Sequence, residues 1–302
     1  HYPLRRQRQM CIRDRYYLIQ IGGMVFRYNG STPSLHSRAS LYFQDSDVYD
    51  ERGYLISAEK VGVQRLVQEM AYLAELAAAQ RCAQPEVPSF ALTDGPLLWP
   101  YPERGKGYAP ALQAYLDALR EIQHVQTVPV GYVDRPGGHA VLDLLWAGQL
   151  QSKVVLQRIN DNPLGRLTDH ELMAHVLLPG ERSAWFTRPT LINRRHTGAG
   201  QEIWFCYLNV GEEARPVIAR VEIPAWAAGD EGGIAMLHTV LYHQAWTLGG
   251  YPYALARAHE EALITTQDKV ALDNLIQRRL IECGVMAQLS EKARQKSYLG
   301  RR

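Results

Sequence analysis

The sequence has no run of 18 apolar residues and only four cysteines among its 302 residues. Without an apolar run of that length, no segment is predicted to span a membrane. The cysteines are scattered, with neither a CxxC pair nor a zinc-type spacing: Cys11, Cys82, Cys206 and Cys283. This usage favours a protein of the reducing cytoplasm over a disulfide-stabilised secreted domain.

Two common catalytic motifs are also missing. The chain has no GxxxxGK[ST] loop, which excludes ATP hydrolysis of the P-loop type. It has no Gx[SC]xG nucleophile elbow, which argues against serine hydrolysis on an α/β-hydrolase fold. Hydrophobic residues make up 46% of the chain and charged residues 21%, and these values are ordinary for a globular enzyme.

The chain has little net charge, and the net charge is positive only because of its first residues. The formal charge is +2, but residues 1–15 contain five arginines and one aspartate, so the remainder has 28 basic and 30 acidic residues. The run 1–15 has no apolar period and resembles translated sequencing-adapter read-through. We expect it to be non-native and to carry no weight for the fold. The charge balance is therefore no argument for nucleic-acid binding.

The pattern of apolar residues predicts a mixed α/β domain over residues 16–289, followed by a basic tail at 290–302. A strand pair or long strand is expected over 16–28, and another strand is expected to begin at Leu41. Further strands are predicted at 89–93, 128–133, 203–209 and 217–223, the last two as an antiparallel hairpin. Helices are predicted at 57–81, 108–125 and 237–245, from Pro252, and from 265 to Gly284, with helices and loops over 139–200.

Asp94 is the sharpest candidate for chemistry. It ends the short strand Ser89-Phe90-Ala91-Leu92-Thr93, so an otherwise apolar strand delivers one carboxylate to the end of the sheet. The following Gly95 allows a ligand to approach the backbone closely. Mg²⁺ and Mn²⁺ prefer oxygen ligands, which makes such a carboxylate suited to metal-assisted phosphodiester cleavage. Taken alone, however, Asp-Gly-Pro is more often simply a turn.

Three further residues are weaker candidates. Glu69 and Glu75 both lie on the helix before the Asp94 strand, but six positions separate them by about 240° around the axis, so both cannot face one site. Each is compatible with a solvated helix face. His259 shares a helix face with Leu255 and Leu263, and a lone histidine on an apolar face is more often a core residue than a ligand.

A second strand ends in Tyr132-Val133-Asp134-Arg135. Arg135 at this strand end is able to hold a phosphate through two hydrogen bonds, and a structural salt bridge is an equally good explanation. Tyr132 and Arg135 are the residues that we assign to DNA or phosphate binding.

Several segments together resemble the NurA nuclease family, in the order in which the family has them. They span Tyr16 to about Leu280 and read Leu92-Thr93-Asp94-Gly95-Pro96-Leu97-Leu98, Val130-Gly131-Tyr132-Val133-Asp134-Arg135-Pro136, Pro179-Gly180-Glu181-Arg182-Ser183, Tyr207-Leu208-Asn209-Val210-Gly211, Arg220-Val221-Glu222-Ile223-Pro224, and Gly250 to His259 followed by Glu260-Glu261-Ala262. Each motif is weak by itself, and the specificity lies in their joint order.

The resemblance implies an RNase H-like mixed sheet flanked by helices, with an inserted helical and hairpin region. It implies a homodimeric, cytoplasmic nuclease that uses Mn²⁺ or Mg²⁺ to cut DNA, as a single-strand endonuclease and a 5′-to-3′ exonuclease. The family acts in DNA repair, in end resection with a HerA-type hexameric ATPase. Carried over by motif, Asp94 and His259 take catalytic and metal-binding roles, and the helix glutamate is Glu69 or, second, Glu75.

One family residue has no counterpart in this sequence. The family has an aspartate in an Asp-Gly-Ser strand shortly before the segment that resembles Tyr16 to Ile19, and here the adapter-like run stands in its place. Asp14 lies nearby without the Gly-Ser context, and no role is carried onto it. The resemblance therefore predicts weak or absent cleavage by the chain as it stands.

Two other functions remain open on the sequence. One is a non-catalytic DNA clamp that docks on a motor ATPase, with the hairpin at 203–223 and the basic tail as its interaction surfaces. The other is an unrelated metal-dependent hydrolase, which would have a closed pocket for a small molecule instead of an open groove.

Overall fold

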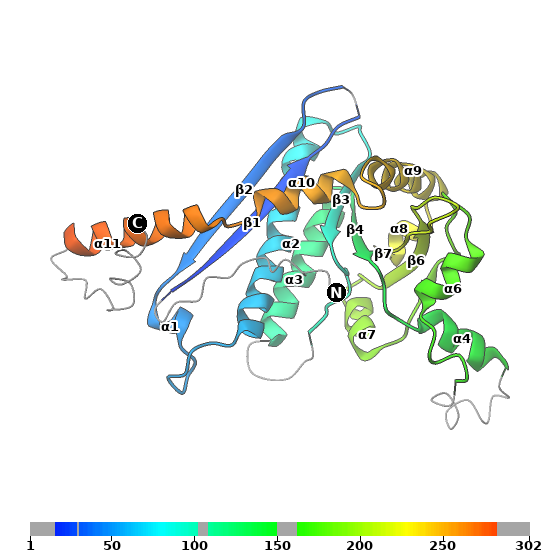
Figure 1. The fold of residues 1–302 in the computed structure, drawn as a ribbon, viewed down its shortest axis with the longest axis horizontal. Helices are drawn as coiled ribbons and strands as arrows, with labels where there is room; N and C mark the ends of the chain where they lie inside the picture. Colours follow the sequence, from blue (N-terminus) through cyan, green and yellow to red (C-terminus); the bar gives the residue numbers. More distant parts are fainter. Residues whose placement is uncertain (1–15, 29, 102–107, 150–161, 283–302) are drawn as a thin grey trace, which may run out of the picture.

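A mixed five-stranded sheet forms the centre of the computed structural model, which describes residues 16–28, 30–101, 108–149 and 162–282 (Figure 1). Across the sheet the strands follow the order β3 (Ser89–Asp94), β4 (Thr127–Asp134), β7 (Ile218–Pro224), β6 (Ile203–Asn209) and β5 (Phe186–Thr187). The pair β3–β4 is parallel and the other neighbours are antiparallel. This is the predicted α/β class, a mixed sheet flanked by helices that is consistent with an RNase H-like fold.

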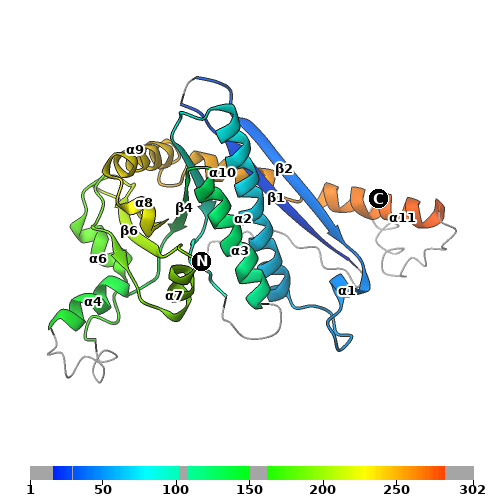
Figure 2. The same cartoon turned by 180° about the vertical axis from the view of Figure 1, so that it is seen from behind.

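Helices cover both faces of this sheet. Figures 1 and 2 show α2 (Ala58–Ala83) and α3 (Tyr108–His124) on one face, with α9 (Glu231–Thr247) and α10 (Tyr253–Glu261) on the other. Strands covered on both faces need apolar residues at nearly every position, and β6 and β7 are accordingly buried almost throughout. Leucines of α3 pack on Ala91 on one side, while Leu237 and Leu255 pack on Val130 on the other.

A separate two-stranded sheet stands beside the five-stranded one. It consists of β1 (Tyr17–Val25) and β2 (Ser34–Tyr42), paired antiparallel. Alternate residues of β1 are buried against α2, so the predicted strand at 16–28 is confirmed. The prediction that a strand begins at Leu41 is wrong, because Leu41 lies one residue from the end of β2. The hydrogen bonds to β1 define β2, whose mixed polar sequence has no clear alternation of its own.

Helices α2 and α10 hold the two sheets together, since each contacts both β1 and β3. The contact between α10 and β1 is close at Gly22, where a Cβ atom would lie 2.1 Å from the Ala258 carbonyl oxygen. A glycine at this position lets the helix backbone lie directly on the strand. Strand β3, which ends at Asp94, therefore lies between the elements that join the two sheets.

The remaining elements surround this core. They are α1 (Asp45–Val48), α4 (Ala140–Gln149), α6 (Asp169–Val176), α7 (Leu191–Gly198), α8 (Ala225–Ala228) and α11 (Thr266–Glu282). The helices predicted within 139–200 are confirmed. Gly284, the predicted end of the last helix, and the tail at 290–302 lie outside the described residues, as does the run 1–15. Among the helices that the structure describes, none has the length and apolar character needed to cross a bilayer.

The hairpin predicted at 203–223 is confirmed as β6 and β7, and the connection between its strands is exposed at 212–215. Strand β7 lies between β4 and β6 in the middle of the sheet, and both strands are almost entirely buried. A strand whose two edges and two faces are all covered offers no surface to a partner. The body of the hairpin is therefore part of the core.

Candidate active site at the end of strand β3

Asp94 and Asp134 lie at the same edge of the sheet. Strands β3 and β4 are parallel, so their carboxyl ends coincide, and Asp94 is in register with Tyr132, two residues before Asp134. Residues two apart on a strand share a face, so both aspartates face the side of the sheet covered by α9 and α10. Burial raises the pKa of Asp134. The charge of Arg135 opposes this shift, and the neighbouring Asp94 carboxylate adds to it. The two carboxylates are thus close enough to repel each other.

The backbone that follows Asp94 is held from several sides. The Gly95 amide donates to the Tyr132 carbonyl at 2.9 Å, with Gly95 at a φ of 128° that favours glycine. The buried Tyr115 hydroxyl donates to the Leu97 carbonyl at 2.8 Å. The Trp99 amide donates to Nε2 of His196 at 3.3 Å. Asp94 is the last residue of β3, Gly95 is bridged to Tyr132, and the chain bends only at Leu97 and Leu98, so buried contacts fix the whole segment at the end of the strand.

Because His196 holds the Trp99 amide, the stability of this segment depends on pH. Its side chain is fully buried, and burial lowers its pKa from 6.5 to about 4. The folded state therefore prefers the neutral ring, whereas the unfolded chain takes up a proton below about pH 6.5. The stability that His196 contributes is complete above about pH 6.5 and is lost as the pH falls toward 4.

We expect the free energy of unfolding to drop by roughly 3 kcal/mol between pH 6.5 and 4 through His196 alone. Urea denaturation across this range, followed by tryptophan fluorescence, measures the slope. The variant His196→Gln should lose most of this slope, and exchange of the exposed His124 is the control. Equal slopes in wild type and His196→Gln would contradict the assignment.

The two candidate glutamates of α2 face different surroundings. Glu69 is half-buried and forms an ion pair with Arg65 at 3.0 Å. It also lies near Tyr115, whose pKa is raised first by burial and then by the charges of Glu222 and Glu69. Glu75 is exposed and pairs with Arg38 of β2, which lowers the pKa of Glu75. The prediction that the two cannot face one site is confirmed, and Glu69 is the one directed toward the segment after Asp94.

The described residues do not gather Asp94, Glu69 and His259 into one metal-binding group. Within the described ranges, no three histidine, cysteine, aspartate or glutamate side chains lie close enough together to hold a metal ion. The physical reason is the layering. Asp94 faces the side of the sheet covered by α10, which carries the half-buried His259, while Glu69 belongs to α2 on the opposite side. Asp94 and Asp134 are the two carboxylates that the fold brings together.

The two residues assigned to DNA or phosphate differ in their access to solvent. Tyr132 is fully buried and its hydroxyl donates to the Gly250 carbonyl at 3.1 Å, so the prediction that it contacts DNA is wrong. Side chains along β4 point alternately to the two faces of the sheet, and this places the Tyr132 ring in the core. Arg135 has a side chain that is 71% exposed, beside Asp134 at 3.9 Å. It takes a positive φ of 54°, a conformation uncommon outside glycine. Its phosphate role remains a prediction.

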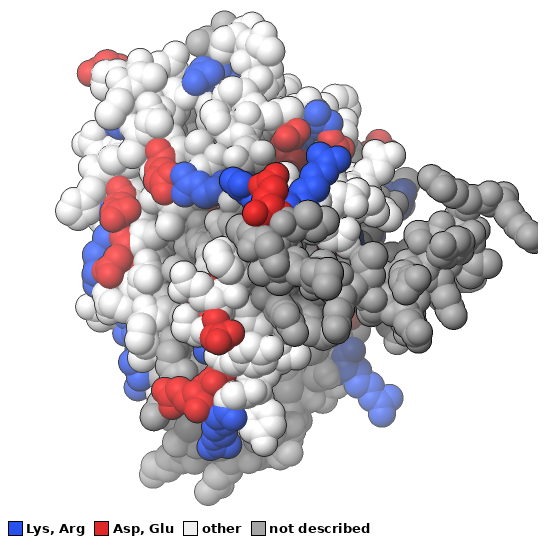
Figure 3. All heavy atoms as spheres, turned by 90° about the vertical axis from the view of Figure 1, so that its left-hand side faces the viewer, with Lys and Arg blue, Asp and Glu red and all other residues white. Residues whose placement is uncertain are grey.

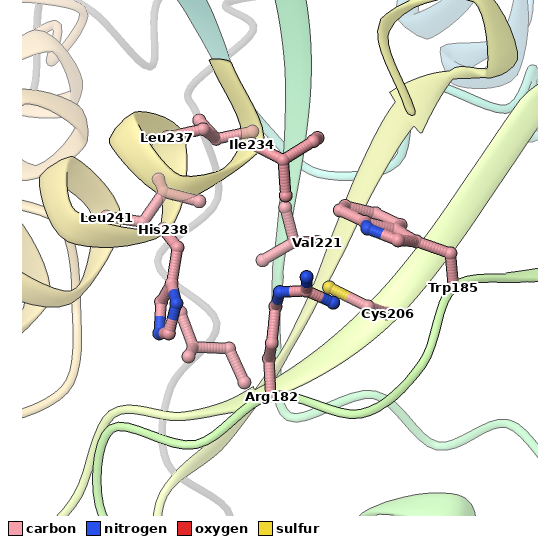
Figure 4. Close-up of a pocket in the computed structure, with 9 residues that line it drawn as sticks. Arg182, Trp185, Cys206, Val221, Ile234, Leu237, His238 and Leu241 are labelled. Carbon is pink, nitrogen blue, oxygen red and sulfur yellow. The ribbon is translucent and has the colours of Figure 1, made fainter. Parts of the chain in front are cut away.

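The cavity in Figure 4 does not favour a small-molecule hydrolase. Its volume is about 10 Å³, whereas pockets for small ligands are usually at least ~300 Å³. The side chains around it are mostly apolar, and Arg182 extends across it toward Trp185 and Cys206. Burial raises the pKa of the Cys206 thiol to about 12, so this thiol is not a nucleophile.

Charges on the face shown in Figure 3 are mixed. Among the described residues visible there, basic and acidic side chains lie next to one another. This agrees with the nearly balanced composition of the chain after residue 15. The described part of this face therefore has no extended basic surface of the size that a DNA duplex would cover.

Comparison with known proteins identifies the family. A family model described as the NurA domain matches residues 10–264. The chain belongs to the NurA family. NurA is a nuclease family, and the match includes every described element from β1 to α10, with Asp94, Asp134 and the residues that hold the backbone around them. No curated protein and no solved structure matches the chain.

Proposed function

We propose that this NurA protein is a metal-dependent deoxyribonuclease whose metal site is built on Asp94 and Asp134. The observation that supports this most is the pair of carboxylates at one sheet edge, within a domain of a nuclease family. Two like charges held together are costly unless a cation lies between them, and carboxylate oxygens suit Mn²⁺ and Mg²⁺. When bound, the ion would supply positive charge to the scissile phosphate and acidify a water molecule.

The side chains of the protein would bind the metal ion, bind the DNA phosphate and transfer the proton. Asp94 and Asp134 provide oxygen ligands, and the exposed Arg135 beside them binds a phosphate of the DNA strand. His259 carries a proton to or from the reacting groups, or adds a ligand. Glu69, on the opposite side of the sheet, would act through the segment after Asp94, near which it lies.

The site needs at least one further carboxylate. Within the described residues β3 pairs on one side only, with β4, so its other edge is available to a strand. A family-type Asp-Gly-Ser strand beside β3 would bring its aspartate to the edge where Asp94 lies. We therefore expect an N-terminal Asp-Gly-Ser strand, joined before Tyr16, to raise cleavage well above that of the 302-residue chain.

Metal dependence is the direct test of this proposal. We expect cleavage of single-stranded DNA by the chain joined to such a strand to require Mn²⁺ or Mg²⁺, to disappear with EDTA and to return when Mn²⁺ is restored. End-labelled substrates separate internal cuts from 5′-to-3′ degradation, both of which we propose for this protein. Cleavage that persists undiminished in EDTA would refute the metal-dependent mechanism.

The choice between the two glutamates has its own test. We expect Glu69→Gln to lower Mn²⁺-dependent cleavage by roughly 10- to 100-fold, because Glu69 is half-buried near the segment after Asp94. The matched variant Glu75→Gln removes an exposed carboxylate of the same helix, paired with Arg38, and should leave the rate within about twofold. The reverse ranking would move the helix carboxylate to Glu75.

The proposed biological setting is DNA end resection with a HerA-type hexameric ATPase, by a homodimer of this chain in the cytoplasm. The competing function is a non-catalytic clamp on the same motor. The strands of the hairpin are buried, which leaves its exposed connection at 212–215 as the surface it could offer, and the basic tail lies outside the described residues. A chain that stimulates such an ATPase while never cutting DNA would favour the clamp.

A further inference from the structure

We propose that Glu222 is a positioning residue, which anchors the backbone after Asp94 and so sets the separation of Asp94 from Asp134. This inference rests on the proposed metal site. Glu222 lies on β7, two strands away from β3, and is 1% exposed. Its Oε2 accepts hydrogen bonds from the amides of Leu97 at 2.9 Å and Leu98 at 3.1 Å. Hydrogen bonds to a buried carboxylate are among the strong ones in proteins.

Strand β4 lies between β7 and β3, so the Glu222 side chain has to cross β4 to contact the segment after Asp94, and it does so at a glycine. Gly131 is in register with Glu222 on one side and with Thr93 on the other. A Cβ atom on Gly131 would lie 2.7 Å from the Leu97 amide nitrogen and 2.9 Å from the Gly95 carbonyl oxygen. Only a residue without a side chain leaves this space, so Gly131 is what allows the segment after Asp94 to lie over β4 and meet Glu222.

Both oxygens of Glu222 are occupied by the protein. Oε1 forms an ion pair with Nη2 of Arg220 at 2.7 Å, and the Arg220 guanidinium stacks on Phe205, 3.9 Å from the ring centroid. The buried charge is thereby compensated without a metal ion. Glu222 is therefore placed to hold the segment after Asp94 and not to bind the metal itself.

The position of this segment matters because it follows Asp94 directly. Gly95 has a φ of 128°, the chain bends at Leu97 and Leu98, and the hydrogen bonds from their amides to Glu222 determine where the segment comes to rest. Metal sites tolerate displacements of their ligands of only about half an ångström. Residues that orient the ligands commonly change metal affinity by roughly 10- to 100-fold when they are exchanged.

The fold contains a matched control for this role. Asp169, at the start of α6, is a fully buried carboxylate that accepts the amides of Val141 at 3.0 Å and Leu142 at 3.0 Å. It also accepts the Tyr207 hydroxyl at 2.7 Å. The chemistry is that of Glu222, and Tyr207 also interacts with Arg220, so Asp169 belongs to the same polar network. The backbone that Asp169 holds is α4, however, and not the segment after Asp94.

The test compares Glu222→Gln with Asp169→Asn in the 302-residue chain, by Mn²⁺ titration calorimetry and by amide hydrogen exchange. We expect Glu222→Gln to weaken Mn²⁺ binding by roughly 10- to 100-fold and to speed exchange at Leu97 and Leu98. Asp169→Asn disturbs the same polar network and should speed exchange at Val141 and Leu142, but it should weaken Mn²⁺ binding clearly less than Glu222→Gln does, because Leu97 and Leu98 keep their acceptor. Wild-type affinity in a Glu222→Gln protein with accelerated exchange would overturn the positioning role.

A second variant guards against loss of folding. Glu222→Gln leaves Arg220 without its partner, so the double variant R220M/E222Q removes the lone cation. Its neutral amide oxygen accepts weaker hydrogen bonds from Leu97 and Leu98 than the carboxylate does. A folded double variant, judged by circular dichroism, should show the same weakened Mn²⁺ binding. Wild-type affinity in it would also overturn the role. Failure of the proposed function is recognised separately, because Asp94→Asn would then leave Mn²⁺ binding unchanged in the otherwise wild-type chain.

Discussion

Exchange of Asp94 for asparagine is expected to lower Mn²⁺-dependent cleavage of single-stranded DNA by at least about a thousandfold, a loss of ~4 kcal/mol of transition-state stabilisation. Asparagine keeps the size of the side chain, but it removes the negative charge that, in the proposed site, would hold the cation beside Asp134. The rate should be measured in the chain joined to an Asp-Gly-Ser strand, and the Mn²⁺ affinity in the 302-residue chain.

The control for this experiment is Asp50→Asn. It shows what the same exchange does at an aspartate whose role is only to stabilise a turn. Asp50 opens a turn in which its carboxylate accepts the amides of Arg52 and Tyr54, each at 2.9 Å. These hydrogen bonds lower the pKa of Asp50, that from Tyr54 most. Asp50→Asn should leave cleavage within about twofold of wild type. Equal cleavage by Asp94→Asn and Asp50→Asn would reduce Asp94 to a structural residue.

Removal of Arg220 is expected to have the largest effect on stability. Arg220→Met leaves the Glu222 carboxylate, 1% exposed, without its cation, and breaking a buried pair in this way typically costs about 3–5 kcal/mol. Methionine keeps contact with Phe205, so the loss reflects charge more than packing. The free energy of unfolding from urea denaturation at pH 7 measures it.

The control for this prediction is an exposed pair of the same type. Arg279 and Glu282 form an ion pair at 2.8 Å with side chains 77% and 59% exposed, and such pairs contribute only about 0–1 kcal/mol. Arg279→Met should therefore hardly move the urea midpoint. The double variant R220M/E222Q should recover part of the stability lost in Arg220→Met, because the lone charge is gone. A loss no greater than that of Arg279→Met would show that the Arg220–Glu222 pair is not a buried one in solution.

The elements whose local pattern is strong were predictable. The helix expected at 108–125 is found at Tyr108–His124, and the strand expected at 128–133 at Thr127–Asp134. Helix α3 buries one continuous apolar face and β4 is buried at nearly every position, so the local pattern and the tertiary packing agree. Strand β2 is the opposite case, because its interior reads Ser-Arg-Ala-Ser and is mostly exposed. Its pairing with β1 determines where it begins and ends, and the local sequence does not predict that pairing.

The sequence also contains a sign of the Arg220–Glu222 pair, although neither residue was among the predicted site residues. Arg220 and Glu222 stand two residues apart in the strand Ile218-Ala219-Arg220-Val221-Glu222-Ile223-Pro224, which is otherwise apolar. Two opposite charges on one face of a buried strand have to be paired or to hold something else in the protein. That pattern marks Glu222 as a buried polar anchor, although it does not say which backbone it holds.

By itself, the sequence determined the family, the class of fold and the strand-end position of Asp94, because each depends on residue order and local periodicity. Only the tertiary structure decided that Asp134 is the carboxylate beside it, that Tyr132 turns into the core, and that Glu222 holds the segment after Asp94 across Gly131. Asp134 and Glu222 lie 40 and 128 positions from Asp94 along the chain. They meet this segment only once parallel and antiparallel strands are brought into register, and hydrogen bonding between strands, not any local pattern, sets that register.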